Sequence, residues 1–404
     1  LLWPRPQAQG LARLFNQSQL IQSFGAAPTR PLPALWRQRL GPVAAALWSR
    51  QQGIWWQFWG AHGDAGAFLV LPAVSLSGIP THRLPVAPLL VDDLAVLAAD
   101  PLSRQWLSDR LRTAMRPPRG LEERCLLQLH RPQTVSWSPA GLGALAGPVA
   151  PLLQRFQQGC LTLELRGQTV DLSGEAAVAV GVLSPASQAR PEPASRPLMP
   201  GQLLELRGPA LEGLLQGLLS RQLVREPLAS RYAIAEPQLA LLRRAPFALR
   251  LRELPQGPFQ AGLELDLVPA ARDRQAWVRL LAALRQPLLQ QGLQDQGTNP
   301  QRSNWRDEQG RVVGGWFWRA PSAGGAPTLV LYLGPEPASG ALPAAPAGAF
   351  VLQARPSDLD RLGLWPAAFP PLVRRAAQLE VQADAEPRQP VSRLRGGLAL
   401  TRSR

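Results

Sequence analysis

The sequence predicts an α+β protein of two lobes, in which mixed sheets are covered by helices. Three observations lead to this class: a strand–helix–helix–strand–strand pattern that recurs along the chain, a Pro/Ser-rich segment near its middle, and a globular composition. The chain has 404 residues, of which 46% are hydrophobic and 18% charged. A chain of this length exceeds one ordinary hydrophobic core, so we expect two or three domains.

The pattern begins with the same opening in four places. Each opening is a short apolar run, then Arg-Pro or Gly-Pro, then a leucine-rich helical segment, because proline removes a ladder donor and favours a helix start. The openings start at Leu1, Leu126, Leu203 and Val351. The four units span about 1–75, 125–183, 202–268 and 349–402. We therefore expect the strands over 203–206 and 351–354 to occupy equivalent places in their units.

Hydrophobic spacing gives the elements inside the units. Leucines within 211–218 recur at i, i+3, i+4 and i+7, which predicts a helix, whereas those of 263–267 alternate and predict a strand. Outside the units, a strand is expected over Leu94–Leu97. Asp100 then caps a helix whose first residue is Pro101.

Later in the chain, an apolar stripe over 277–284 predicts a further helix, and a hairpin follows it around 312–333. The Pro/Ser-rich segment 184–201 is the best predicted domain boundary. It divides the chain into a first lobe over 1–183 and a second lobe over 202–404.

The net charge of +15 does not by itself indicate a nucleic-acid partner. All 43 basic residues are arginine, as a GC-rich coding sequence would produce, and they are scattered along the chain. Nucleic-acid binding requires a concentrated positive face, so the sequence disfavours it. Attraction to anionic lipid headgroups fits this charge better.

Few residues point to catalysis. His62 lies in an expected hairpin turn and His82 in a loop, while His130 occupies a position where other units have proline or glycine. Asp92 and Asp93 are expected in a turn, because adjacent strand residues point to opposite faces. The sequence contains neither a zinc-like spacing nor a phosphate-binding loop, so we expect no catalytic residue, metal or cofactor.

The chain has 13 tryptophans but only two tyrosines. The strand "IWWQFW" places Ile54, Trp56 and Phe58 on one face. A strand that is apolar on both faces is usually covered on both, so we expect Trp56 and Phe58 to be buried. Trp55 and Trp59, on the other face, are the candidates for stacking on a sugar or contacting an apolar ligand or a membrane.

Cys125 and Cys160 are each expected where a strand of the second unit begins. If those strands are parallel neighbours, both cysteines lie at one end of the sheet and their Cα atoms come within disulfide range. If the strands are antiparallel or separated by a third, the thiols lie apart. The disulfide is therefore one of two interpretations, the other being two buried small apolar residues.

The segment "DDLAVLAADPLSRQWLSDRL" resembles a signature of a large family of uncharacterised bacterial proteins, common in cyanobacteria and described only as a domain of unknown function. Leu94–Pro101 carries the likeness to the family's strand-to-helix motif, with Ala99–Asp100 where the family often has two serines. The resemblance implies repeated α+β modules behind an N-terminal hydrophobic anchor. It implies no catalytic residues, because none are established for the family.

These observations favour a non-enzymatic structural or binding protein of the cell envelope or thylakoid, with a protein or lipid partner. We expect an extracytoplasmic location, in the periplasm or thylakoid lumen, and membrane tethering through a segment upstream of Leu1. One alternative is a carbohydrate- or apolar-ligand-binding module that uses the tryptophan strands. Another is a hydrolase with an unrecognised site.

Overall fold

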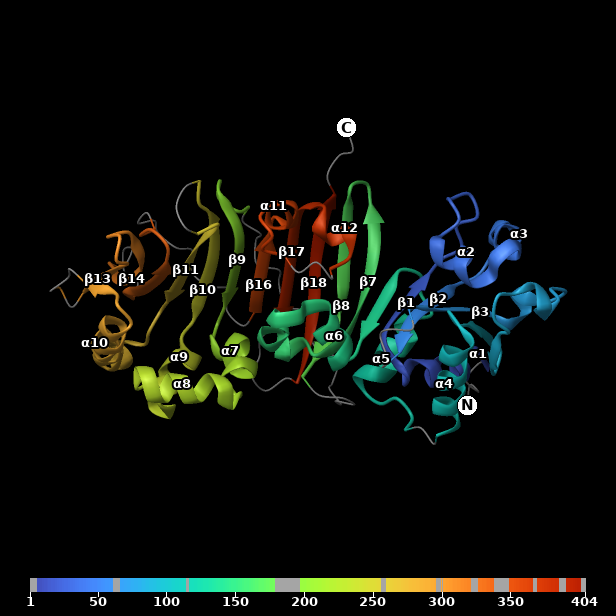
Figure 1. The fold of residues 1–404 in the computed structure, drawn as a ribbon, viewed down its shortest axis with the longest axis horizontal. Helices are drawn as coiled ribbons and strands as arrows, with labels where there is room; N and C mark the ends of the chain where they lie inside the picture. The colour runs from blue at the N-terminus through green and yellow to red at the C-terminus, as the bar shows by residue number, and fades with distance from the viewer. Residues whose placement is uncertain are drawn as a thin grey trace.

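The computed structural model shows an elongated molecule whose single large sheet runs along its longest axis (Figure 1). The N-terminal elements lie at one end, residues near 270–330 lie at the other, and the last strands of the chain lie in the middle. The structure describes residues 6–60, 66–113, 116–178, 197–255, 259–295, 299, 301–320, 326–337, 349–365, 369–384 and 390–400.

The described chain contains 18 strands, all in this sheet. They are β1 (Ser18–Phe24), β2 (Trp55–Gly60), β3 (Phe68–Pro72), β4 (Leu89–Val91), β5 (Leu94–Leu97), β6 (Thr134–Trp137), β7 (Gln158–Arg166), β8 (Thr169–Ala177), β9 (Gln202–Gly208), β10 (Phe247–Glu253), β11 (Ala261–Leu267), β12 (Gln294–Asp295), β13 (Arg302–Arg306), β14 (Val312–Arg319), β15 (Thr328–Leu333), β16 (Ala349–Ala354), β17 (Ala376–Asp384) and β18 (Val391–Leu400).

The helices fall between these strands. They are α1 (Pro6–Phe15), α2 (Ala34–Leu40), α3 (Ala44–Ser49), α4 (Pro101–Arg112), α5 (Leu121–Gln128), α6 (Pro139–Ala146), α7 (Glu212–Leu219), α8 (Gln222–Tyr232), α9 (Glu236–Arg244), α10 (Arg274–Gln290), α11 (Pro356–Arg361) and α12 (Pro371–Arg374), with 3-10 helices at η1 (Gly41–Val43), η3 (Ala73–Leu76), η4 (Thr81–Arg83), η5 (Gly147–Phe156) and η6 (Ala271–Asp273). None of the described helices is long and apolar enough to span a membrane.

Strand pairing gives the order β4-β5-β3-β2-β1-β6-β7-β8-β18-β17-β16-β9-β10-β11-β15-β14-β13-β12. Every one of these pairs is antiparallel, so the expectation of mixed sheets is wrong. Four helical connections return a strand beside its predecessor in the opposite direction, namely β2 beside β1, β7 beside β6, β10 beside β9 and β17 beside β16. One sheet runs through both predicted lobes, because β8 pairs with β18.

The predicted strands over 203–206 and 351–354 are confirmed as β9 and β16, which pair with each other. In the second unit the opening is displaced, whereas the apolar run that opens the first unit, from Leu1, lies outside the described residues. The run at 126–130 belongs to the end of α5 and a turn, and the strand β6 begins after the Arg-Pro at 131–132. The apolar run fits a helix as well as a strand, and tertiary packing against α1 decides for the helix.

The N-terminal part of the sheet is covered on both faces. Leucines of α1 and α4 pack on the face that carries Ile21 and Phe58. Helices α2 and α3 pack on the opposite face around Trp55, together with their own Trp36 and Trp48. Trp56 and Phe58 are buried, as predicted, at 4% and 0% exposure. The doubly apolar strand β2 therefore reflects a three-layer arrangement.

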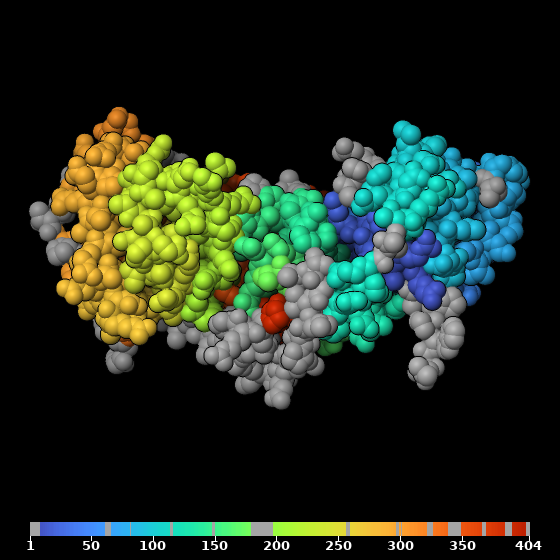
Figure 2. Space-filling view, turned by 90° about the horizontal axis from the view of Figure 1, so that it is seen from below, coloured from blue at the N-terminus to red at the C-terminus, as the bar shows by residue number. Residues whose placement is uncertain are grey.

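In the C-terminal part, the described helices pack on one face. Helices α7 to α10 bury the face that carries Leu206, Leu249 and Leu265, and α11 packs beside them. Figure 2 shows the yellow-green residues of α7–α9 beside the green residues of α6 on this side of the molecule. We call the opposite face of β7–β11 and β16–β18, which carries Glu164, Glu380 and Arg250, the polar face.

Candidate functional site

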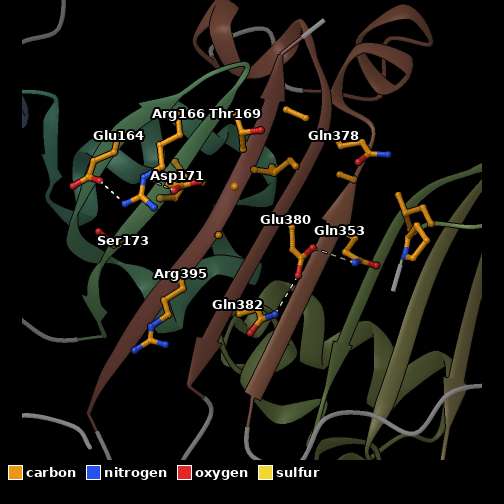
Figure 3. A pocket seen from close by; sticks show the side chains of 18 residues that line it. Glu164, Arg166, Thr169, Asp171, Ser173, Gln353, Gln378, Glu380, Gln382 and Arg395 are labelled. Carbon is orange, nitrogen blue, oxygen red and sulfur yellow. Dashed lines mark hydrogen bonds and ion pairs between the residues drawn. The ribbon is translucent and has the colours of Figure 1, made fainter. Parts of the chain in front are cut away.

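A trough of about 980 Å³ lies on the polar face. It crosses β7, β8, β18, β17 and β16, in that order, and the segment at Pro197–Leu198 borders it (Figure 3). Its side chains are mostly carboxylates, amides, hydroxyls and guanidiniums. We call this cavity the polar trough.

Strand alternation brings these side chains to one face. On β17, Gln378, Glu380 and Gln382 recur at every second position, and the apolar residues between them point to the helix-covered face. On the neighbouring hairpin, Glu164 lies opposite Asp171. Antiparallel register then places these groups in rows that cross the sheet.

One wall of the trough is an ion-pair cluster on the β7–β8 hairpin. The guanidinium of Arg166 lies 3.0 Å from Glu164 and 3.1 Å from Asp171. The hydrogen bond that Arg166 donates to Glu164, followed by the charges of Asp171 and Glu164, raises the pKa of Arg166. Because all three side chains are substantially exposed, the cluster adds little stability and its groups remain accessible to a ligand.

The other wall is built from amides around one carboxylate. Gln353 and Gln382 each donate a hydrogen bond to Glu380, at 3.4 and 3.1 Å (Figure 3). Gln353 on β16 is buried, with 6% of its surface exposed. Gln378, which lies on β17 two residues before Glu380, is exposed. The carboxylate of Glu380 thus accepts hydrogen bonds from two neutral amide donors.

Arg395 is the one guanidinium of the trough that has no hydrogen bond or ion pair with any described residue. It is half-buried on β18, opposite Ser173 and Gln382. Two residues along, Gly397 lies between Asp171 and Glu380 and leaves the floor bare, since an added Cβ would meet its nearest atom at 3.6 Å. The trough therefore offers an available cation beside an open floor.

Beyond β16 the polar face continues as a closed charge cluster. Arg250 contacts Glu205 at 2.8 Å and Asp266 at 2.7 Å, and Arg319 lies 3.2 Å from Glu264. Arg250 and Asp266 are 4% and 1% exposed. Burial, and then the charge of Glu264, raise the pKa of Asp266 to about 6, while Arg250 and Arg319 act in the opposite direction. With its charges paired internally, this cluster is structural.

The trough is lined mostly by polar side chains. Its lining residues can donate and accept hydrogen bonds and pair with charges, and they include no histidine. Within the described parts of the chain, no group of three or more histidines, cysteines or carboxylates is placed to hold a metal. The hydroxyls of Thr169 and Ser173 are exposed on β8 and make no hydrogen bond to another described side chain.

The residues singled out from sequence lie elsewhere. Trp55 is 4% exposed and stacked on Phe24 at 4.2 Å, so the expectation that it offers a stacking platform is wrong. Trp59, on the same strand face, is half-buried and does not line the trough. Asp92 lies in the β4–β5 turn with a φ of 54°, as expected of a turn residue.

The histidines are also remote from the trough. His82 is exposed in η4, and His130 lies half-buried in the turn after α5. His62 lies outside the described residues. The predicted helix cap is confirmed, since the side chain of Asp100 accepts a hydrogen bond from the Ser103 backbone at 2.9 Å.

Cys125 and Cys160 are joined by a disulfide with a Cα separation of 5.5 Å. The route to it differs from the expected one. Cys125 lies on α5 rather than at the start of a strand, and Cys160 lies on β7. The bond therefore ties a helix to the sheet instead of joining two parallel strands.

Sequence reasoning missed the trough residues. The signal was present on β17, where polar residues alternate with apolar ones over 376–384. The trough also includes β8, which pairs with β18 and comes from about 200 residues earlier in the chain, and no local pattern predicts that pairing. No protein-family model matches this chain, and no curated protein or solved structure compared with it is similar.

Proposed function

We propose that the protein is a non-enzymatic binding protein whose polar trough holds an extended, polar segment of a protein partner. The observation that carries the proposal is Arg395, a half-buried guanidinium without a described partner in a cavity lined by amides and carboxylates. An ordered arginine of this kind is suited to bidentate pairing with a carboxylate.

The dimensions of the trough fit a peptide. Five neighbouring strands spaced about 4.8 Å apart cover roughly 19 Å, and an extended chain advances about 3.3 Å per residue. About six residues would therefore cross it. The amides of Gln353, Gln378 and Gln382 match the donors and acceptors that a peptide backbone presents. The lining contains no aromatic ring on which a sugar could stack.

Charge selects which peptide fits best. Arg166 already pairs with Glu164 and Asp171, and Glu380 is hydrogen-bonded by glutamines. Arg395 remains for the ligand, so we expect an acidic side chain near the middle of the bound segment. A hydrogen bond to a charged group contributes about 1.5–3 kcal/mol, or roughly ten- to a hundredfold in affinity.

Fluorescence polarisation with two pools of capped hexapeptides tests the proposal. One pool carries Glu or Asp at its central positions and the other carries Gln or Asn. We expect the acidic pool to bind about tenfold more tightly, and Arg395→Gln to abolish this preference. Arg252→Gln is the matched control, because Arg252 lies on the same face but two strands outside the trough.

Two outcomes would overturn the proposal. The first is the absence of saturable binding by either pool. The second is an acidic preference that survives Arg395→Gln, since the guanidinium would then not be its source. Circular dichroism of both variants should match that of the native protein, because neither arginine makes a described contact that folding requires.

We also infer that the sheet is built from four related units arranged as two lobes. The support is a recurring connection, in which the first strand of a unit pairs with the next strand after the intervening helices: β1 with β2, β6 with β7, β9 with β10, and β16 with β17. First strands also pair with each other, β1 with β6 and β9 with β16. Expression of 202–404 alone tests the lobes, since an independent lobe unfolds cooperatively.

The remaining proposals concern location. We propose an extracytoplasmic protein that is tethered to a membrane by a segment upstream of Leu1. The disulfide supports export, because such bonds persist in oxidising compartments. The coding sequence upstream of Leu1 tests the tether, and fractionation of the native cells tests the compartment.

A further inference from the structure

A second cavity, separate from the polar trough, lies at the far end of the sheet. It has a volume of about 310 Å³, is open to solvent on one side, and is lined by residues of the end of α10, of the segment after it, and of β11, β13, β14 and β15. Its lining is almost wholly apolar, with seven leucines, one valine, two tryptophans, one tyrosine and two glycines. We call it the apolar cavity.

The cavity arises because the apolar stripe of α10 continues past the point where the core beneath the helix ends. Trp277, Leu280 and Leu281 are buried in the main core of this half. One and two turns later, Leu284 and Leu288 continue the same stripe but are only half-buried, and they line the cavity. These leucines face the sheet across unfilled space.

The opposite wall contains a hydrogen-bond donor without a partner. Trp305 lines the cavity at 3% exposure, beside Trp316 at a ring distance of 5.8 Å. The indole Nε1 of Trp305 makes no hydrogen bond, although a buried tryptophan usually finds an acceptor. The hydroxyl of Tyr332 is already engaged, since it donates to Asn304.

The rim is apolar as well. Leu333 lines the cavity and is 58% exposed, and Leu289, next to Leu288 on α10, is 39% exposed. Water gains little in such a space, because it needs two or more polar partners. A dry cavity of roughly half this size, lined by similar residues, accepts benzene. The present volume lies at the lower end of the range for ligand pockets.

We propose that the apolar cavity binds one hydrocarbon chain that carries a single hydrogen-bond acceptor, as in a medium-length fatty acid. The leucine walls take the chain, and the acceptor satisfies Trp305. This site differs from the polar trough in position and chemistry, so either proposal can fail without the other.

Dodecanoic acid is the probe, titrated calorimetrically below its micelle concentration. We expect saturable binding with one site per chain. Titration with 12-bromododecanoic acid should quench part of the tryptophan fluorescence over the same concentration range, because bromine quenches indoles that it contacts.

Two matched pairs of variants locate the site. Leu288→Trp fills the cavity and should weaken dodecanoate binding by about tenfold or more. Leu289→Trp is its control, because it makes the same change on the adjacent residue, which is exposed and outside the lining. It should leave the affinity within about twofold. Trp305→Phe removes the free donor and should weaken binding by about three- to tenfold. Trp318→Phe removes another unpartnered indole N–H outside the lining and should have no effect.

Thermal unfolding of each variant shows whether it is folded under the binding conditions. If Leu288→Trp is unfolded, Trp305→Phe and Trp318→Phe still decide the outcome, since aromatic replacement conserves most of the volume. Absence of saturable dodecanoate binding would overturn the proposal. So would equal losses in both members of each pair, or tight binding of naphthalene without binding of dodecanoate.

Discussion

The two ends of the sheet differ in how many of their faces are covered. Over β1–β3, helices lie on both faces, and the strand sequence Trp55–Gly60 is rich in aromatic residues throughout. Over β9–β11, helices lie on one face, and leucines alternate with arginine, glutamate and aspartate. The composition of a strand thus reflects how many of its faces are covered, and the polar trough lies where only one face is covered.

The largest effect should come from the doubly covered end. Phe58 is fully buried and stacked on Phe68 at 4.7 Å, so Phe58→Ala should lower the free energy of unfolding by about 3–5 kcal/mol. Gln378→Ala, on the open face of β17, should change it by no more than about 0.5 kcal/mol. Urea unfolding at neutral pH measures both.

Phe58→Leu keeps most of the volume and should cost less than about 1.5 kcal/mol, which gives a folded variant if the alanine variant does not accumulate. Similar losses for Phe58→Ala and Gln378→Ala would contradict the comparison, because they would mean that the open face is as tightly packed as the covered one.

A comparable loss of stability is expected on the polar face, but only in the closed charge cluster around Arg250. Arg250→Met leaves the buried carboxylates of Glu205 and Asp266 without their main partner and should cost about 3–5 kcal/mol. Arg361→Met removes an exposed ion pair with Glu253, 3.0 Å long, and should cost less than about 1 kcal/mol. If both variants lose the same free energy of unfolding, the buried ion pairs of Arg250 contribute no more to stability than the exposed pair of Arg361.

The disulfide lies where helical cover on the polar face of the sheet ends. It ties α5, which packs with Leu121 and Cys125 against β7 and β8, to Cys160. Replacing both cysteines by alanine should lower the free energy of unfolding by about 3–4 kcal/mol in the chain-entropy model, for a loop of 35 residues. Hydrogen exchange should quicken over 121–128.

Alkylation before mass spectrometry tests the bond directly. We expect no labelled cysteine without reductant and two after reduction. Two labelled thiols in the unreduced protein would contradict the bond and would weaken the proposal of export.

Sequence patterns predicted the elements that local spacing determines. The strand over Leu94–Leu97 with its capped helix, the helix stripe over 277–284 and the hairpin around 312–333 were all predicted and are present. The opening of the second unit was misplaced, because "LLQLH" fits both periods and β6 has only four residues. Burial of Trp56 was predictable, since a strand that is apolar on both faces needs two covers.

The trough could not be predicted for a different reason. Its rows of side chains depend on the pairing of β8 with β18 and of β16 with β9, which join segments more than 100 residues apart. Strand spacing indicates which residues share a face, but only the pairing indicates which strands are neighbours. The availability of Arg395 depends further on which partners the register leaves beside it.

The smallest effect is a pH dependence that compares the closed cluster with the rest of the polar face. The pKa of Asp266 is raised to about 6 by burial and by Glu264, against the opposing charges of Arg250 and Arg319, whereas an unfolded aspartate titrates near pH 3.8. A raised pKa in the folded state means that the stabilising contribution is complete below the unfolded pKa and is lost as the pH rises through about 6.

We therefore expect the stability of Asp266→Asn, relative to the native protein, to improve as the pH rises from about 4 to about 6.5. Asparagine does not ionise, so it avoids the burial of a charge that the native carboxyl undergoes over this window. Urea unfolding of both proteins at pH 4, 5, 6 and 7 measures the difference. A difference that moves the other way would show that attraction to Arg250 outweighs burial at Asp266, so that the closed cluster favours the charged form of this carboxyl.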